Sequence, residues 1–250
     1  MAAEGCTLRS VPTRRNFGMS ANTTAVGSRD HRSVNADKKR HETKARILVA
    51  ALAACAIDMR HPPSIEDIVE KARVSRGTFY KYFDSVEEVL AALGQDLTRL
   101  ALLEGERFRG VFTEKWKSTA VALRVVLTRA MLDANWAGFV VRTRGWVSDG
   151  LLASLVLQDL AEGRASGEYR ILDDQAALDV LRGLLESCVR SLHDGVAGPD
   201  RYIDAVVHMW LQALGCEPDR CLEGVQMSKR FLSAYISGEL QPFTIPDALE

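Results

Sequence analysis

Apolar residues recur three and four positions apart along most of the chain, a spacing typical of amphipathic α-helices. Ten segments with this period are separated by short stretches of proline, glycine and capping residues. They cover about 37–59, 64–72, 75–83, 85–108, 114–134, 136–146, 148–162, 174–194, 200–214 and 219–237. With 7 prolines in 250 residues, the pattern predicts an all-α fold.

The segment SIEDIVEKARVSRGTFYKYF, which begins at Ser64, predicts two short helices joined by a tight turn. Ser64 can cap the first helix, and Asp67 three residues later completes a capping box. Ser75 can cap the second helix, in which Phe79 and Phe83 lie one turn apart and face inward.

The outward side of this second helix has the chemistry of a nucleic-acid contact. It presents Arg76, Gly77, Thr78, Tyr80 and Lys81. The start of a helix attracts phosphate, and in a helix-turn-helix the second helix inserts this end into the major groove. The alternative is a plain helical hairpin with a solvated polar face, which the tyrosines beside arginine and lysine disfavour.

The sequence VSRGTFYKYF at Val74–Phe83, followed by DSVEEVL, resembles the DNA-binding signature of the TetR family of bacterial transcriptional regulators. The match runs from Lys38 to Leu90, whereas the rest of the chain matches only as a run of helices. Arg73 occupies a turn position where the family usually has glycine, which predicts a left-handed backbone there. Val86 stands where the family usually has lysine, so one expected phosphate contact is missing.

The pattern and the resemblance together predict a set of DNA-contacting residues. They are Lys44, Ser64, Ser75, Arg76, Gly77, Thr78, Tyr80, Lys81 and Tyr82. Thr78 and Lys81 are the candidates for base edges. Contacts to phosphate or sugar are expected from Tyr80, Tyr82, Ser64 and Lys44.

Charge is distributed unevenly along the chain, and the excess of positive charge in the N-terminal third agrees with DNA binding by that part. The net charge is −1, but residues 1–83 hold 15 Lys and Arg against 8 Asp and Glu, and the rest of the chain holds 17 Lys and Arg against 25 Asp and Glu.

The predicted organisation is a disordered basic arm (1–36), a three-helix helix-turn-helix domain (37–84), a connecting helix (85–109), a larger helical ligand-binding and dimerisation domain (110–240) and an irregular tail (241–250). The arm either reaches a minor groove or has no role.

The resemblance implies that the second domain holds a small-molecule pocket. Large, adaptable side chains and one arginine, from the end of the connecting helix and from this domain, supply the candidates, namely Phe108, Trp116, Met131, Trp136, Phe139, Arg142 and Trp146. A mostly apolar or aromatic ligand is expected. Each tryptophan has the alternative of an ordinary core position, and the arginine that of a surface position.

Segments 174–194 and 200–214 carry wide apolar stripes, and two copies of each would form a four-helix bundle in a homodimer. The predicted interface residues are Leu181, Leu184, Leu185, Cys188, Leu192, Val207, Trp210, Leu211 and Leu214. The alternative is that both helices pack only within their own subunit. A two-fold dimer would read a palindrome with half-sites about 34–36 Å apart.

Motifs for catalysis, metal binding and cofactors are not found in the sequence. The five histidines have no metal-ligand spacing, and the five cysteines contain no C-x-x-C pair, so free core thiols are expected. A metal or redox role for Cys216 and Cys221 is the minor alternative. Without a long apolar run or a signal peptide, the chain is expected to be cytoplasmic, with no membrane partner.

These observations predict a non-enzymatic, ligand-responsive transcriptional regulator without a cofactor. It would bind a palindromic double-stranded operator as a homodimer, act most simply as a repressor, and be released by a small, mostly apolar molecule. An activator and a ligand-independent regulator are the alternatives that keep the DNA module. A helical small-molecule-binding protein without DNA binding is the more distant one.

Overall fold

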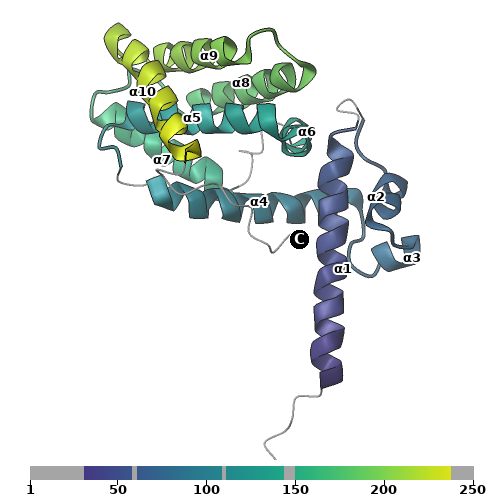
Figure 1. The fold of residues 1–250 in the computed structure, drawn as a ribbon. Coiled ribbons are helices and arrows are strands. Elements are labelled where there is room, and N and C mark those ends of the chain that lie inside the picture. Colours follow the sequence, from purple (N-terminus) through teal and green to yellow (C-terminus); the bar gives the residue numbers. More distant parts are fainter. Residues whose placement is uncertain (1–30, 58–60, 109–110, 144–149, 238–250) are drawn as a thin grey trace, which may run out of the picture. The chain divides into compact units, whose positions relative to one another are not determined.

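The computed structural model describes residues 31–57, 61–108, 111–143 and 150–237, and its regular elements there are ten α-helices, which confirms the predicted all-α class. The helices are α1 (His31–Cys55), α2 (Ile65–Ala72), α3 (Arg76–Phe79), α4 (Val86–Phe108), α5 (Lys115–Leu132), α6 (Ala134–Arg142), α7 (Gly150–Ala165), α8 (Asp174–Asp194), α9 (Pro199–Ala213) and α10 (Pro218–Ile236) (Figure 1).

The first helix differs from the prediction at its start. α1 begins at His31 and not at Asp37, so it includes the last residues of the segment expected to be a disordered arm. Residues 31–36 contain neither proline nor glycine, and therefore they can extend the helix. The remainder of the predicted arm, the predicted helix end at Met59 and the tail 241–250 lie outside the described residues.

Residue contacts divide the chain into two units, with the boundary inside α1 after Lys39. Among the described residues, the first unit contains only the beginning of α1, whose side chains from Val34 to Lys39 are exposed. The second unit, residues 40–250, contains the rest of α1 and all the other helices.

The first four helices share an apolar core. Ile47 of α1, Ile68 of α2, Phe79 of α3 and Leu93 of α4 are all fully buried. The burial of one side chain from each helix fixes the short α2 and α3 against the two longer helices, since isolated helices of that length are marginal in water.

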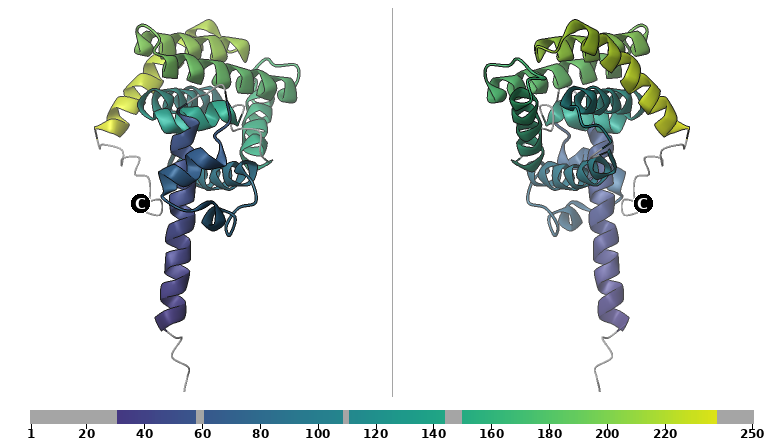
Figure 2. Two further views of the ribbon diagram at one scale, coloured as in Figure 1. Left: turned by 90° about the vertical axis from the view of Figure 1, so that its right-hand side faces the viewer. Right: turned by 90° about the vertical axis from the view of Figure 1, so that its left-hand side faces the viewer.

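Helix α5 is the centre of the second domain and packs against α6, α7, α8, α9 and α10. Figures 1 and 2 show α8 and α9 on the same side of α5, joined by a short loop. Trp116, Leu123 and Leu127 of α5 are buried at these contacts.

A buried polar network ties α5 to α9 and α10. The side chain of Arg124 donates to Oγ of Ser228 at 2.9 Å and to a carboxylate oxygen of Asp204 at 2.5 Å. Lys229 reaches the other oxygen of Asp204 at 3.2 Å. Burial acts to raise the pKa of Asp204, but the hydrogen bonds from Arg124 and Lys229 outweigh it and the pKa is lowered.

The segment after α7 is hydrogen-bonded to the start of α5. A carboxylate oxygen of Glu168 accepts the backbone N–H of Trp116 at 3.1 Å, and so satisfies one of the free donors at the start of that helix. The hydroxyl of Tyr169 is 2.8 Å from that of Thr119. The buried ring of Tyr169 lies directly against Gly163, where a β-carbon would be 2.2 Å from Cε2 of the ring.

Helix α6 approaches the end of α1 at backbone distance. A β-carbon on Gly138 would lie 2.5 Å from the carbonyl oxygen of Cys55, so only glycine permits this contact. The neighbouring Phe139 is fully buried, and its ring lies 3.6 Å from the position of a β-carbon on Gly94 of α4. These contacts join the helices that hold the DNA-binding motif to the second domain.

Candidate nucleic-acid interface

The first helix of the motif begins with the predicted capping box. Oγ of Ser64 accepts the backbone N–H of Asp67 at 3.1 Å, and a carboxylate oxygen of Asp67 accepts the backbone N–H of Ser64 at 2.8 Å. The Ser64 hydroxyl also donates to that carboxylate at 2.6 Å. The hydrogen bonds from Ser64 lower the pKa of Asp67. The Ser64 hydroxyl is thus already engaged within the chain.

The turn between α2 and α3 depends on one unusual backbone conformation. Arg73 has φ 52° and ψ 48°, in the left-handed region, as the sequence predicts. Its N–H donates to the carbonyl of Glu70 at 3.1 Å, and the N–H of Val74 donates to that of Val69 at 3.1 Å. These bonds end α2 and reverse the chain, while the left-handed geometry costs a non-glycine residue about 1–2 kcal/mol.

The second helix of the motif is shorter than predicted, because α3 covers only Arg76–Phe79. Oγ of Ser75 accepts the N–H of Thr78 at 3.0 Å, which confirms the predicted cap. Turns then continue the chain as far as Phe83, whose N–H donates to the carbonyl of Phe79 at 3.1 Å. Both rings are buried, as predicted, with centroids 6.2 Å apart.

The outward side of α3 and its following turn carries most of the predicted DNA contacts. Ser75, Arg76, Gly77, Tyr80 and Lys81 are exposed, and Tyr80 exposes 48% of its surface. Thr78 is half-buried and its hydroxyl is 2.9 Å from that of Ser75. Tyr82 differs from the expectation of two exposed tyrosines, because it is half-buried and packs against the core.

Two cations of the predicted set have partners within the chain. A guanidinium nitrogen of Arg76 lies 2.7 Å from a carboxylate oxygen of Glu66 on α2. The ammonium of Lys44, on α1, lies 5.7 Å from the centroid of the Phe83 ring. The Lys44 contact brings a cation of α1 next to the end of the recognition segment, although the two are far apart in sequence.

The start of α4 offers no cation. Glu88 donates its N–H to Oγ of Ser85 at 3.2 Å, and its carboxylate accepts the N–H of Asp84 at 2.6 Å. Val86 is half-buried against the core, and the first turn also carries Glu87. The first turn of α4 thus carries two carboxylates and no positively charged side chain.

The predicted ligand residues do not form one group. Trp116 lies at the start of α5, where its ring is 3.6 Å from the position of a β-carbon on Gly224 of α10. Trp136 follows the other end of α5, with the guanidinium of Arg129 at 5.0 Å from its ring. At 1.5 Å per residue these ends are roughly 25 Å apart, too far for one small molecule to touch both tryptophans.

The remaining ligand candidates gather on or near α6. Trp136 and Phe139 are buried, Arg142 of the same helix is half-buried, and so is Met131 at the end of α5. The side chain of Phe108 and the whole of Trp146 lie outside the described residues. Trp116 belongs instead to the α5–α10 packing, the core position that the sequence left open.

Most of the predicted dimer residues are buried within the single chain, the packing that the sequence left open as the alternative. Those buried in this way are Leu185, Cys188, Leu192, Val207, Trp210, Leu211 and Leu214. The wide apolar stripes of α8 and α9 thus face α5, and the two helices pack within their own subunit through them. Leu181 and Leu184 are half-buried, while Val180 and Met209 expose 56% and 62% of their surface.

The part of the chain that the structure describes has free thiols, and it has neither a metal-binding cluster nor a membrane span. Cys55, Cys188, Cys216 and Cys221 are free and buried, and burial raises the pKa of Cys55 to about 11. The described part of the chain holds no cluster of three or more His, Cys, Asp or Glu fit for a metal ion. None of the described helices is long and apolar enough to cross a membrane.

A capped α2, a tight left-handed turn and a capped α3 with inward phenylalanines and an outward polar side define a helix-turn-helix DNA-binding protein. The profile of the family described as "Bacterial regulatory proteins, tetR family" matches residues 61–93. An uncharacterised HTH-type transcriptional regulator of Bacillus subtilis, YdgC, is 28% identical over 186 residues, which is 69% of this chain and 93% of YdgC. The motif, the family profile and the similarity to YdgC together indicate a DNA-binding transcriptional regulator of the TetR type.

Solved structures extend the similarity of fold to the second domain. RolR in complex with resorcinol has a TM-score of 0.56 and 22% identity, covering 78% of this chain and 96% of RolR. RolR without ligand has a TM-score of 0.53 and 20% identity, covering 74% of this chain and 96% of RolR. The fatty acid degradation regulator FadR from Bacillus halodurans has a TM-score of 0.52 and 18% identity, covering 70% of this chain and 97% of FadR.

Proposed function

We propose that this regulator is a homodimeric repressor that binds a palindromic operator and releases it when a small, mostly apolar molecule binds. The observation that carries the proposal is the exposed set of hydroxyls, cations and tyrosine on α3 and its following turn, held by two capped helices. In this proposal residues 37–84 read DNA, 85–109 connect, and 110–240 bind the ligand and the second subunit.

The exposure of each side chain and its partners within the chain decide which kind of DNA contact we propose for it. Lys81 is exposed in the turn that follows α3, and Thr78 is half-buried within α3; these two are proposed to reach base edges. Tyr80 is proposed to contact phosphate or sugar. Arg76 would exchange its ion pair with Glu66 for a phosphate, so its net contribution is expected to be smaller than that of Lys81.

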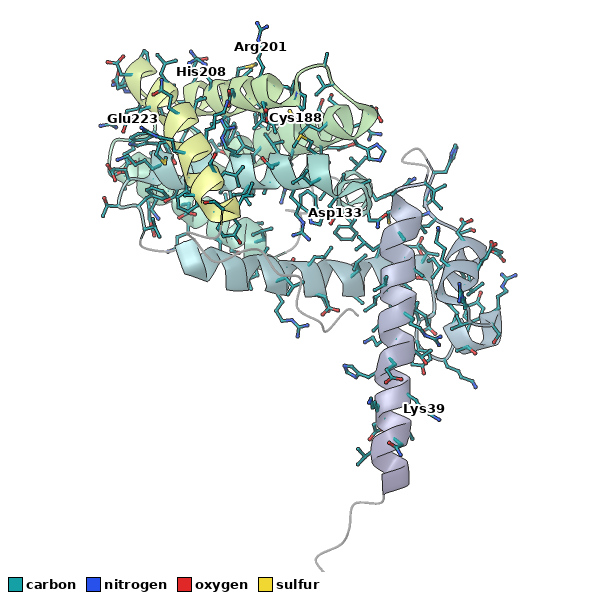
Figure 3. All side chains as sticks on the ribbon, in the orientation of Figure 1. Lys39, Asp133, Cys188, Arg201, His208 and Glu223 are labelled. Atoms are coloured by element: carbon teal, nitrogen blue, oxygen red, sulfur yellow. The ribbon has the colours of Figure 1, made fainter. Side chains whose placement is uncertain are left out.

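The proposed dimer uses the sides of α8 and α9 that the chain leaves exposed. Val180 and Met209 supply apolar surface there, the half-buried Leu184 lies at its edge, and Gly183 leaves open space for a close helix approach. Arg201 projects outward from the same helix as Met209 (Figure 3). A two-fold axis would place the two recognition helices about 34–36 Å apart, in successive major grooves.

The dimer is tested by Val180→Glu and Met209→Glu, combined in the full-length chain. Two carboxylates on an apolar contact should convert the dimer to a monomer in sedimentation, and should weaken operator binding on the order of 100-fold. The matched control is Leu222→Glu, an exposed leucine on α10. A double variant that still sediments as a dimer would remove α8 and α9 from the interface.

The proposed ligand site lies around α6, where Trp136, Phe139 and Arg142 come from one helix and Met131 from the end of the preceding one. RolR was solved with resorcinol, a small aromatic molecule, and FadR is named for fatty acid degradation. Both names support a mostly apolar or aromatic ligand here, with Arg142 facing an acidic or hydroxyl group. Because α6 contacts Cys55 of α1 at Gly138, a ligand beside α6 could shift the DNA-binding helices.

Selection from a random pool of double-stranded DNA with the purified full-length protein tests the proposed function. A palindrome with two equal half-sites is expected, and a panel of small aromatic and fatty acids should then contain molecules that release it. Binding to a palindrome without release by any of them would favour a ligand-independent regulator. Tighter binding in the presence of a ligand would favour an activator, and no enrichment at low salt would contradict a DNA reader.

A further inference from the structure

Arg73 holds a backbone conformation that suits glycine and not arginine. Of the described residues with positive φ, five are glycines and Arg73 is the one that carries a β-carbon. Glycine enters this region without a steric penalty, whereas the β-carbon of an L-residue crowds the following carbonyl. The turn itself needs the left-handed geometry, because the bonds from the N–H groups of Arg73 and Val74 close α2 through it.

The fold makes no use of the arginine side chain. Arg73 is exposed, and its guanidinium forms no ion pair or hydrogen bond with any residue that the structure describes. Arg76, three positions later, is paired with Glu66, and Arg124 is paired with Asp204. A residue that strains the backbone and stabilises nothing within the chain is expected to serve an external partner.

The position of Arg73 identifies the chemistry of that partner. Two residues separate it from the first residue of α3, so a long cationic side chain stands at the edge of the proposed DNA-contacting surface. A guanidinium offers a planar fork of donors that matches phosphate oxygens. Further along the chain, after α3, the first turn of α4 carries Val86, Glu87 and Glu88 and no cation.

We propose that Arg73 binds a backbone phosphate of the DNA beside the recognition helix, and that it supplies a cation next to this surface where the first turn of α4 supplies none. The proposal rests on DNA binding through α3 and adds a phosphate-binding residue that is not among the DNA contacts predicted from the sequence. Since phosphate contacts carry no sequence information, Arg73 contributes to affinity for any duplex.

The decisive variant is Arg73→Gly in the full-length protein, because it separates the two properties of this residue. Removing the β-carbon relieves the strained backbone, so the melting temperature should rise by about 2–4 °C. Removing the guanidinium should weaken binding to a mixed-sequence duplex at low salt on the order of 10-fold. The slope of log K against log salt should become shallower by about 0.9 for each phosphate that the protein no longer neutralises.

Two further variants separate charge from backbone. Arg73→Lys keeps both the β-carbon and a cation, so the melting temperature and most of the salt slope should be retained. Arg73→Asn tolerates the left-handed region but lacks the charge, so binding should weaken without a fall in melting temperature. Arg230→Gln, which removes an exposed cation from α10, is the matched control and should leave binding unchanged.

Each result decides the proposal. A more stable Arg73→Gly protein that binds DNA as tightly as the parent, with the same salt slope, would show that Arg73 binds no phosphate. A less stable Arg73→Gly protein would contradict the strain on which the inference rests. If the parent itself binds no duplex at low salt, DNA binding by α3 and phosphate binding by Arg73 both fail, which distinguishes that case from failure of the Arg73 interaction alone.

Discussion

The helix-turn-helix and the second domain are held together at different ranges along the chain, and this difference decides how each one responds to change. In the motif, Ser64 bonds to Asp67 and Ser75 to Thr78, three residues apart in both cases. In the second domain, Arg124 bonds to Ser228 across 104 residues. The motif is therefore specified locally and leaves its outer side free, whereas the second domain depends on interactions that form only when the whole domain folds.

The largest loss of stability is expected from Gly163→Ala, which fills the space between α7 and the segment that follows it. The new β-carbon would stand 2.2 Å from the ring of Tyr169, which is buried and bonded to Thr119. Displacing the ring should lower the free energy of unfolding by about 3 kcal/mol, measured by urea denaturation. Gly94→Ala in α4 is the control, because a β-carbon there would lie 3.6 Å from the ring of Phe139, an ordinary van der Waals distance, and should be neutral or stabilising.

A smaller loss, about 2 kcal/mol, is expected from Arg124→Met, because Asp204 and Ser228 are left without their buried partner. The effect should depend on pH. Burial acts to raise the pKa of Asp204, but the hydrogen bonds to its carboxylate lower that pKa below the ordinary value of 3.8. The stabilisation by the charged carboxylate is therefore fully present above pH 3.8 and is lost as the pH falls through the lowered pKa. The difference in unfolding free energy between parent and variant should thus narrow as the pH falls below 3.8, and a difference that stays constant on acidification would contradict this account.

The smallest effect of the three is expected in the motif. Ser64→Ala removes a helix cap and should cost about 1 kcal/mol, because one backbone donor and the reciprocal bond to Asp67 are left without their partner. Hydrogen exchange of α2 amides should report the change locally. Ser233→Ala, which removes a hydroxyl within α10, is the control and should leave α2 unaffected. If Ser64→Ala destabilised the whole protein as much as Gly163→Ala, the proposed difference between the locally held motif and the second domain would be contradicted.

The same distinction explains which features could be predicted from the sequence. The caps at Ser64 and Ser75, the left-handed Arg73 and the inward Phe79 and Phe83 all follow from spacings within one turn. The length of α3 does not follow, because the chain after Phe79 is held by tertiary packing of Phe83 and Tyr82 and not by helical bonds alone.

In the second domain, helical period predicts the elements but not their neighbours. The stripe that includes Val207 and Trp210 is apolar whether it faces a second subunit or α5, and the structure assigns it to α5. Trp116 and Trp136 look equivalent in sequence, yet α5 separates them by its whole length. Glu168 accepts the N–H of Trp116 from 52 residues away, an interaction for which the sequence carries no local signal.

The most direct test of the DNA-reading surface compares Tyr80→Ala and Lys81→Ala with the parent on the selected operator, by titration at several salt concentrations. Both side chains are exposed, so neither change should alter the melting temperature or the oligomeric state. Each variant is expected to bind about 10- to 100-fold more weakly, and the loss of Lys81 should also relax the sequence preference at one position of each half-site. Two folded variants that bind the operator as tightly as the parent would contradict the assignment of this surface to the major groove.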